Sequence, residues 1–187
     1  ARVLRMDLDT TSKKGGHEEI LSAFAEGDAD ILIGTQMIVK GHDFPDVTLV
    51  GVLAADLSLY TPDYRAAERT FQLLTQAAGR AGRDARHGDV IIQTYNPEHY
   101  SIVTAAEQDY ETFYHQEMAY RRLMKYPPVN VLFTVQMASK SEAALVEAAD
   151  RLAAHITPLA DAEKVQMIGP VDASVYKIND IYRKILY

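Results

Sequence analysis

The sequence predicts an α/β protein with a mostly parallel sheet, because short apolar runs alternate with segments of helical periodicity along its first half. Strands buried on both faces usually read as apolar runs without polar alternation. Four such runs are present: residues 3–6, 30–35, 47–54 and 89–95. Strands that alternate with helices favour a parallel sheet with helices on both faces. After Pro97 the pattern changes to longer helices and then to a smaller α+β arrangement.

The first predicted helix covers residues 17–26. Ile20, Leu21 and Phe24 share one face there, and Gly27 follows. Glycine is common just past a helix C-terminus because it adopts left-handed backbone angles without steric cost. We therefore expect the helix to end at this glycine.

A second long helix is predicted to begin at Thr61-Pro62-Asp63 and to run to about Gly79. Threonine is a good N-cap, proline suits the first helical position, and an acid in the first turn complements the helix dipole. At about 100° per residue two faces separate on this helix. The apolar face holds Tyr64, Ala67, Phe71, Leu74 and Ala78, and the polar face holds Arg65, Arg69, Gln72, Gln76, Arg80 and Arg83.

The polar face has two interpretations. A solvated face usually mixes Lys with Glu, whereas this one is built from Arg and Gln with only Glu68 at its edge. Since the planar guanidinium matches phosphate oxygens, the alternative is a surface that faces phosphate. Gly79 and Gly82 either end the helix or let a ligand or a second lobe approach Arg80 and Arg83 closely.

The remaining chain is predicted to hold helices across about residues 98–125 and then a second domain. Tyr126-Pro127-Pro128 stops a helix, because consecutive prolines cannot continue it. We expect the domains to cover residues 1–125 and 126–187. The second domain reads as a strand over 129–138, a helix over about 142–156 and two or three further strands from Val165 to Tyr187, an α+β unit missing its end.

Composition narrows the class of protein. The 187 residues are 48% apolar and 24% charged, carry a formal net charge of −7 and include no cysteine. Thiolate metal sites and disulfides within the chain are therefore excluded, and a site for a polyanion must be local. The longest apolar runs fall short of the roughly 20 residues of a membrane helix. We expect a soluble, cytoplasmic protein and, because both ends fall in strand-like stretches, a fragment of a longer one.

Two weaker motifs suggest other sites. The stretch GTQMIVKG, residues 34–41, superficially suggests a phosphate-binding loop, but Lys40 precedes Gly41 and the required order is absent. His42-Asp43 suggests a metal pair, yet no second cluster with ligand spacing accompanies it, so no metal site is predicted. The alternative is a loop histidine beside an acid that binds no metal.

Two stretches of the sequence resemble motifs of a known helicase superfamily. QAAGRAGR, residues 76–83, resembles motif VI of superfamily 2 helicases, and residues 31–56 resemble motif V. These motifs, together with PDYRAAERTFQLLT before motif VI, make the amino-acid sequence similar to that of the PriA family of primosomal helicases across roughly residues 1–125. YPP at 126–128, GPV at 169–171 and YRKILY at 182–187 resemble the start of that family's C-terminal domain.

The resemblance implies the second RecA-like lobe of an ATP-dependent 3′ to 5′ DNA helicase that restarts stalled replication forks by primosome assembly. By motif position, Arg80 and Arg83 are implied to contact the ATP phosphates. Gln76, Gly41 and Asp43 are implied to line the nucleotide side, and Thr35 and Lys40 the DNA side. The implied partners are forked and single-stranded DNA, single-strand-binding protein and primosome proteins, with the protein associated with the nucleoid.

Other parts of the family's active site are missing from this stretch. ATP with Mg²⁺ is implied to bind mainly to a first lobe that the chain lacks, and the family's cysteine-rich zinc module is also absent. We therefore expect the fragment alone to be inactive. The alternatives are a catalytically silent interaction or scaffold domain, and another superfamily 2 translocase that acts on RNA or on different DNA structures.

Overall fold

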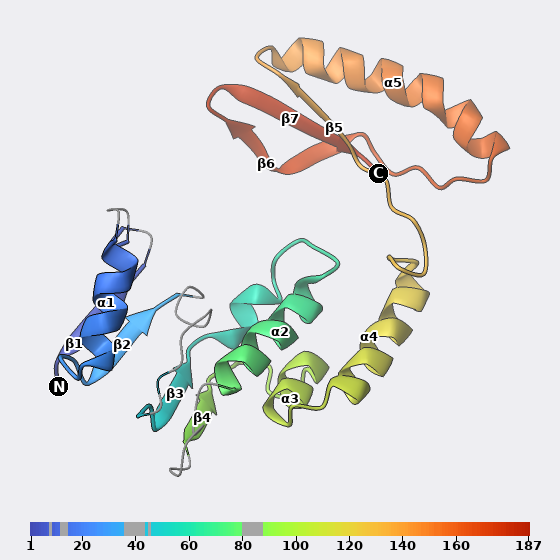
Figure 1. The fold of residues 1–187 in the computed structure, drawn as a ribbon. Coiled ribbons are helices and arrows are strands. Elements are labelled where there is room, and N and C mark those ends of the chain that lie inside the picture. Colours follow the sequence, from blue (N-terminus) through green and yellow to red (C-terminus); the bar gives the residue numbers. More distant parts are fainter. Residues whose placement is uncertain (8, 12–14, 36–43, 45, 80–87) are drawn as a thin grey trace. The chain divides into compact units, whose positions relative to one another are not determined.

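The computed structural model describes residues 1–7, 9–11, 15–35, 44, 46–79 and 88–187. The chain divides into two compact units, Ala1–Ala119 and Tyr120–Tyr187 (Figure 1). This packing boundary falls inside a helix and precedes the Tyr126-Pro127-Pro128 stretch. The division expected at residue 126 stays a prediction about the family's domains.

The first parallel strand pair consists of β1 (Val3–Met6) and β2 (Ile31–Gly34), joined through α1 (Gly16–Ala25). The predicted end of α1 is confirmed. Gly27 has a positive φ of 81°, its N–H donates to the carbonyl of Phe24, and the N–H of Asp28 donates to that of Ala23. This pair of bonds satisfies carbonyls that the last helical turn leaves open.

The second parallel pair consists of β3 (Leu49–Val52) and β4 (Asp89–Ile92), joined through the short 3₁₀ helix η2 (Ala55–Ser58) and α2 (Ala66–Ala78). Helices thus alternate with parallel strands as the α/β class requires. Among the described residues, the four strands form two separate two-stranded sheets.

The expectation that these strands are buried on both faces is wrong for the described residues. Val3, Ile31 and Ile33 lie on one face of the first pair and are exposed, whereas Met6 on the other face is fully buried. Leu49 and Ile91 are likewise exposed in the second pair. The reason is that each two-stranded sheet has its own helix on one face, so only half of its side chains are covered.

The core of the first unit lies between α2, α3 (Tyr100–Ala106) and α4 (Tyr110–Met124). Phe71 of α2 stacks on Phe113 of α4 with ring centroids 4.1 Å apart, and the cluster is completed by Ala55, Leu74, Ile102 and Ala105. This apolar cluster fixes the rotation of α2, and therefore decides which of its side chains remain exposed.

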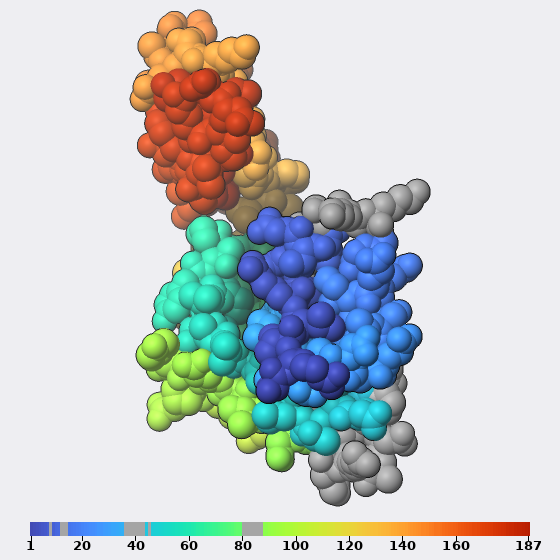
Figure 2. Space-filling view, turned by 90° about the vertical axis from the view of Figure 1, so that its left-hand side faces the viewer, coloured from blue at the N-terminus to red at the C-terminus, as the bar shows by residue number. Residues whose placement is uncertain are grey.

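The second unit is a three-stranded antiparallel sheet with one helix. The strands β5 (Val135–Ser139), β6 (Val171–Ile178) and β7 (Ile181–Leu186) pair in the order β5-β7-β6, and α5 (Glu142–Ala162) packs against β5 and β7. In the space-filling view, α5 and the β6–β7 hairpin form one continuous body (Figure 2). The predicted α+β arrangement is therefore present, with β5 beginning later and α5 ending later than expected.

Candidate functional site

The candidate residues divide between the described and the remaining parts of the chain. Thr35 and Gln76 are described. The other candidates lie outside the described residues: Lys40, Gly41, Asp43, Arg80 and Arg83. The described part of the candidate site consists of β2 and α2, which precede in the chain those parts of motifs V and VI that lie outside the described residues.

The described part of α2 exposes the polar face that its periodicity predicts, whereas the predicted apolar face is only partly right, because Tyr64, Ala67 and Ala78 are half-buried. Its buried side chains are Phe71 and Leu74 with Ala66, Thr70 and Ala77. The exposed side chains on the opposite side are Arg65 (the N-cap residue), Arg69, Gln72 and Gln76. The face assigned to phosphate recognition thus remains accessible over the whole described helix.

The C-terminal end of α2 lies immediately before the first arginine of motif VI. The N–H of Gly79 donates to the carbonyl of Thr75 at 3.0 Å, and Gly79 keeps a negative φ of −68°. A Cβ at Gly79 would come no closer than 3.5 Å, an ordinary contact distance, to the Thr75 carbonyl oxygen. The described residues therefore support the helix-end interpretation of Gly79, and close approach of a second lobe stays a prediction.

The predicted N-terminal end of α2 is wrong: the helix begins at Ala66, and Thr61 and Pro62 belong to the preceding turn. The Asp63 carboxylate accepts the backbone N–H of Arg65 at 2.9 Å. An aspartate that bonds a backbone N–H two residues later stabilises a turn in competition with a helix. This bond delays the helix by about one turn.

Asp63 also changes the electrostatics of the arginine face. One carboxylate oxygen lies 2.8 Å from Nη1 of Arg69, and the other lies 3.5 Å from Nε of Arg65. The backbone N–H of Arg65, followed by the charges of Arg69 and Arg65, lowers the pKa of Asp63. Sequence reasoning placed Asp63 in the first helical turn, as an acid that complements the helix dipole, and missed that it partly neutralises two arginines.

Asp56 is a second polar residue that sequence reasoning missed. It is only 3% exposed and follows β3, where its carboxylate accepts the N–H groups of Tyr95 at 2.9 Å and Asn96 at 3.2 Å and the hydroxyl of Thr94. These bonds, with that of Thr94 the largest cause, lower the pKa of Asp56. Asp56 therefore ties the segment after β3 to the segment after β4. The signal in the sequence was an acid at the end of the apolar run that contains β3.

Thr35 lies where the DNA-facing edge is expected. Because Met6 pairs with Gly34, Asp7 and Thr35 are the first residues after neighbouring strand ends. Ligands in parallel α/β sheets bind at the carboxyl ends of the strands. Thr35 is exposed there.

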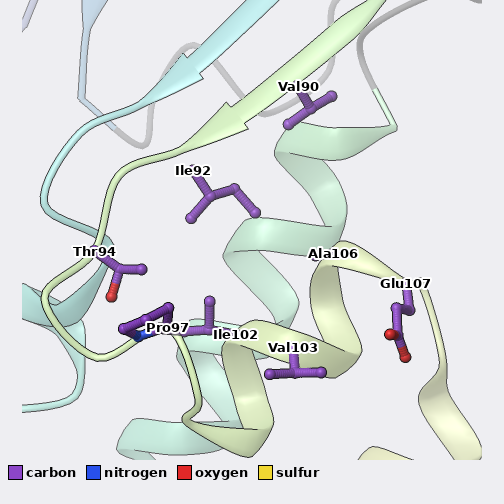
Figure 3. Close-up of a pocket in the computed structure, with 8 residues that line it drawn as sticks. All are labelled: Val90, Ile92, Thr94, Pro97, Ile102, Val103, Ala106 and Glu107. Atoms are coloured by element: carbon purple, nitrogen blue, oxygen red, sulfur yellow. The ribbon is translucent and has the colours of Figure 1, made fainter.

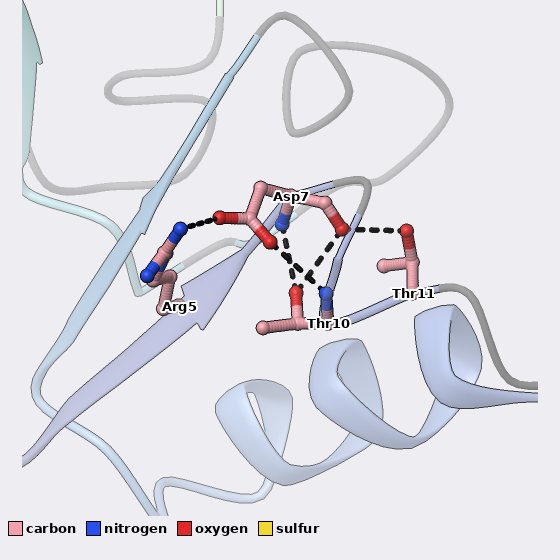
Figure 4. A network of polar contacts seen from close by, with 4 residues as sticks. All are labelled: Arg5, Asp7, Thr10 and Thr11. Carbon is pink, nitrogen blue, oxygen red and sulfur yellow. Dashed lines mark hydrogen bonds and ion pairs between the residues drawn. The ribbon is translucent and has the colours of Figure 1, made fainter.

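The Asp7 turn at this edge is fixed by its own hydrogen bonds (Figure 4). The N–H of Asp7 donates to the Thr10 hydroxyl at 2.8 Å, the N–H of Thr10 donates to the Asp7 carboxylate at 3.0 Å, and Thr11 donates to the Asp7 carbonyl at 2.6 Å. The Thr10 N–H is the largest cause of the lowered pKa of Asp7, which also pairs with Arg5. Asp7, Thr10 and Thr11 are therefore joined by hydrogen bonds at the strand end next to that of Thr35.

A hollow of about 380 Å³ lies between β4 and α3 (Figure 3). Its lining is mostly aliphatic, with Val90, Ile92 and Ile102 pointing toward it and Thr94 and Glu107 as polar members. It offers no cationic group for a nucleotide. Within the described ranges, no group of three His, Asp or Glu side chains is placed to hold a metal ion, and no described helix combines the length and apolarity that crossing a membrane requires.

Comparison with known proteins shows which family and which relatives this chain is similar to. Residues 2–85 match the helicase conserved C-terminal domain family. The chain is 54% identical over 183 residues to replication restart protein PriA of Bacillus subtilis, covering 98% of this chain and 23% of that protein. The corresponding values are 42% identity, 97% and 22% for PriA of Synechocystis, and 39%, 97% and 25% for PriA of Haemophilus influenzae.

The chain thus spans about a quarter of the length of these curated relatives. Its matched region begins just before β1 and includes α2 and the QAAGRAGR motif. Residues 2–85 are therefore similar to the helicase conserved C-terminal domain family, and nearly the whole chain is similar to one segment of the PriA replication restart proteins.

Proposed function

We propose that this chain is the arginine-bearing lobe of an ATP-dependent DNA helicase, which moves 3′ to 5′ and restarts stalled replication forks by primosome assembly. The observation that carries the proposal is α2: Phe71 and Leu74 anchor it, Gln72 and Gln76 are exposed on it, and it ends two residues before Arg80. The domain match and the PriA relatives support the same assignment.

The chemical role that we propose for Arg80 and Arg83 is stabilisation of charge on the transferred phosphoryl group. Phosphoryl transfer depends mainly on positioning and on fixed cationic groups around the phosphate oxygens. A guanidinium suits this role because its fork of donors is planar and permanently charged. Gln76, Gly41 and Asp43 are proposed to line the same nucleotide, with Gln76 exposed near the end of α2.

The rest of the ATP site is proposed to come from other parts of the longer protein. Mg²⁺ supplies charge neutralisation and orientation of the phosphates when it is bound. Its ligands are not found as a cluster in the described part of this chain, and the chain has no cysteine for the family's zinc module. We therefore propose that the chain alone does not hydrolyse ATP at a meaningful rate.

The DNA contact is proposed to use Thr35 and Lys40 on backbone phosphates. Such contacts position a strand without reading its sequence, as a translocase requires. Opening and closing of the two lobes around ATP would then shift the Thr35 edge along the strand. Contacts with single-strand-binding protein and primosome proteins, and a cytoplasmic location near the nucleoid, belong to the same proposal.

The test is ATP-driven strand displacement by the full-length protein on a forked DNA. We expect the wild type to unwind the fork and Arg83→Ala to abolish unwinding while the protein still binds the fork. A matched control is Arg122→Ala, because Arg122 is an exposed arginine of α4. Unwinding by Arg83→Ala at the wild-type rate would favour the silent scaffold instead.

A further inference from the structure

The start of α2 holds two guanidiniums on one carboxylate. Arg65 and Arg69 lie one helical turn apart, and both contact Asp63. The side chain of Asp63 is only 20% exposed, whereas those of Arg65 and Arg69 are 51% and 50% exposed. The cluster therefore keeps a net charge of about +1, and its accessible surface is guanidinium rather than carboxylate.

This cluster is distinct from the motif VI arginines. Arg69 lies nine residues before the end of α2 at Ala78. At about 1.5 Å per residue that is roughly 14 Å along the helix axis. The cluster therefore lies at the opposite end of α2 from the end that leads into Arg80.

Two tyrosines close to the cluster in the sequence, Tyr60 and Tyr64, indicate which anion it suits. The Arg65 guanidinium lies over the Tyr64 ring, 5.2 Å from its centroid. Tyr60 lies three residues before Asp63 in the chain and is 73% exposed, and no contact with another aromatic ring is found for it among the described residues. Arginine beside an open aromatic ring is typical of surfaces for single-stranded nucleic acid, where phosphates meet the cation and bases stack on the ring.

We propose that Arg65 and Arg69 bind a backbone phosphate of single-stranded nucleic acid, which replaces the Asp63 carboxylate on the guanidiniums. A neighbouring base stacks on Tyr60. Asp63 thus acts as an internal competitor that orders both arginines while the strand is absent and weakens the contact when it is present. This inference rests on the proposed function and adds a second strand contact, apart from Thr35 and Lys40.

The experiment measures binding of a fluorescently labelled oligothymidylate to this chain at several salt concentrations. Asp63→Asn removes the competing charge and keeps an oxygen for the Arg65 N–H. We expect about three- to ten-fold tighter binding, since exposed ion pairs of this kind are worth only tenths of a kcal/mol to about 1 kcal/mol each. The slope of log K against log salt should steepen by about 0.7 for each further phosphate that the variant neutralises.

The matched control is Asp180→Asn, which removes the same charge from an exposed ion pair with Lys177 in the second unit. Equal tightening by both variants would show an effect of net charge alone and overturn the inference. The double variant Asp63→Asn/Arg69→Gln should bind no more tightly than the wild type. Asp63→Ser, which also keeps an acceptor for the turn, repeats the test if Asp63→Asn does not fold by circular dichroism.

Two further arms separate the possible ligands. Tyr60→Leu should weaken binding about five-fold or more, and Tyr60→Phe should leave it unchanged, because stacking needs the ring and not the hydroxyl. ATP at equal phosphate concentration should not displace the strand; displacement would assign the cluster to free nucleotide and overturn the proposal. An affinity of Asp63→Asn equal to that of the wild type would sink this inference while leaving the proposed function intact.

Discussion

Removal of the Phe71 ring should strongly destabilise the first unit while leaving the stability of the second unit unchanged. Phe71 is 5% exposed, stacks on Phe113 at 4.1 Å and lies 6.2 Å from the Tyr110 ring. Phe71→Ala removes this buried ring from a core that also contains Leu74 and Ile102. Such truncations cost about 3–5 kcal/mol, a large fraction of the roughly 5–15 kcal/mol by which a domain is stable.

The assay is urea unfolding followed by circular dichroism, with the transition of the second unit as an internal reference. The control is Tyr95→Ala, because Tyr95 belongs to the first unit and is 89% exposed, so that removal of its ring should cost about 0.5 kcal/mol or less. A loss for Phe71→Ala as small as that of the control would contradict the account of the core. Since α2 carries Gln76 and leads to Arg80, the same variant should also lower DNA-stimulated ATP hydrolysis of the full-length protein.

Three further predictions concern single hydrogen bonds. His99 caps α3 through Nδ1, and burial lowers the pKa of His99. The free energy of unfolding should therefore fall as pH drops below about 6.5, because the unfolded chain takes up the proton first. His99→Asn, which keeps a capping oxygen, should flatten that pH dependence in urea titrations, and an unaltered slope would contradict the account. Ser141 caps α5 by accepting the N–H of Ala144 at 3.3 Å, so Ser141→Ala should destabilise the second unit by about 1 kcal/mol, while Ser174→Ala in β6, at an exposed residue, should not. Tyr176 donates to Glu142 at 2.6 Å, which raises the pKa of Tyr176 to about 12. In an ultraviolet absorbance titration one tyrosine should ionise at about that pH, and Tyr176→Phe should abolish that step. The stability of the wild type should decline as pH rises above about 10, because the unfolded chain loses the proton first.

Local pattern was sufficient for the elements of the first unit. The period of apolar residues located α1, α2 and the parallel strands, and Gly27 marked the end of α1 because a left-handed residue is needed there. The start of α2 was not predictable in the same way. Threonine, proline and aspartate favour a helix start individually, but the bond from the Arg65 N–H to Asp63 stabilises a turn instead.

The features that could not be predicted from the sequence depend on contacts between residues that are far apart in the chain. Asp56 bonds to groups 38 to 40 residues away, and no periodicity reveals such a pairing. The exposed faces of β1 and β2 likewise depend on which helices cover the sheet and not on the strands' own residues. For the candidate site, pattern reasoning predicted the polar face of α2, whereas the roles of Arg80 and Arg83 came from resemblance and stay a prediction.

The measurement that tests the central claim most directly is kcat for DNA-stimulated ATP hydrolysis by the full-length protein carrying Arg80→Ala or Arg83→Ala. An arginine that stabilises the transferred phosphoryl group contributes roughly 10³-fold or more to kcat. We predict a loss of that order in both variants, unchanged DNA binding, and normal turnover for Arg122→Ala. Wild-type turnover in either motif VI variant would contradict the claim that this chain supplies the arginine half of the ATP site.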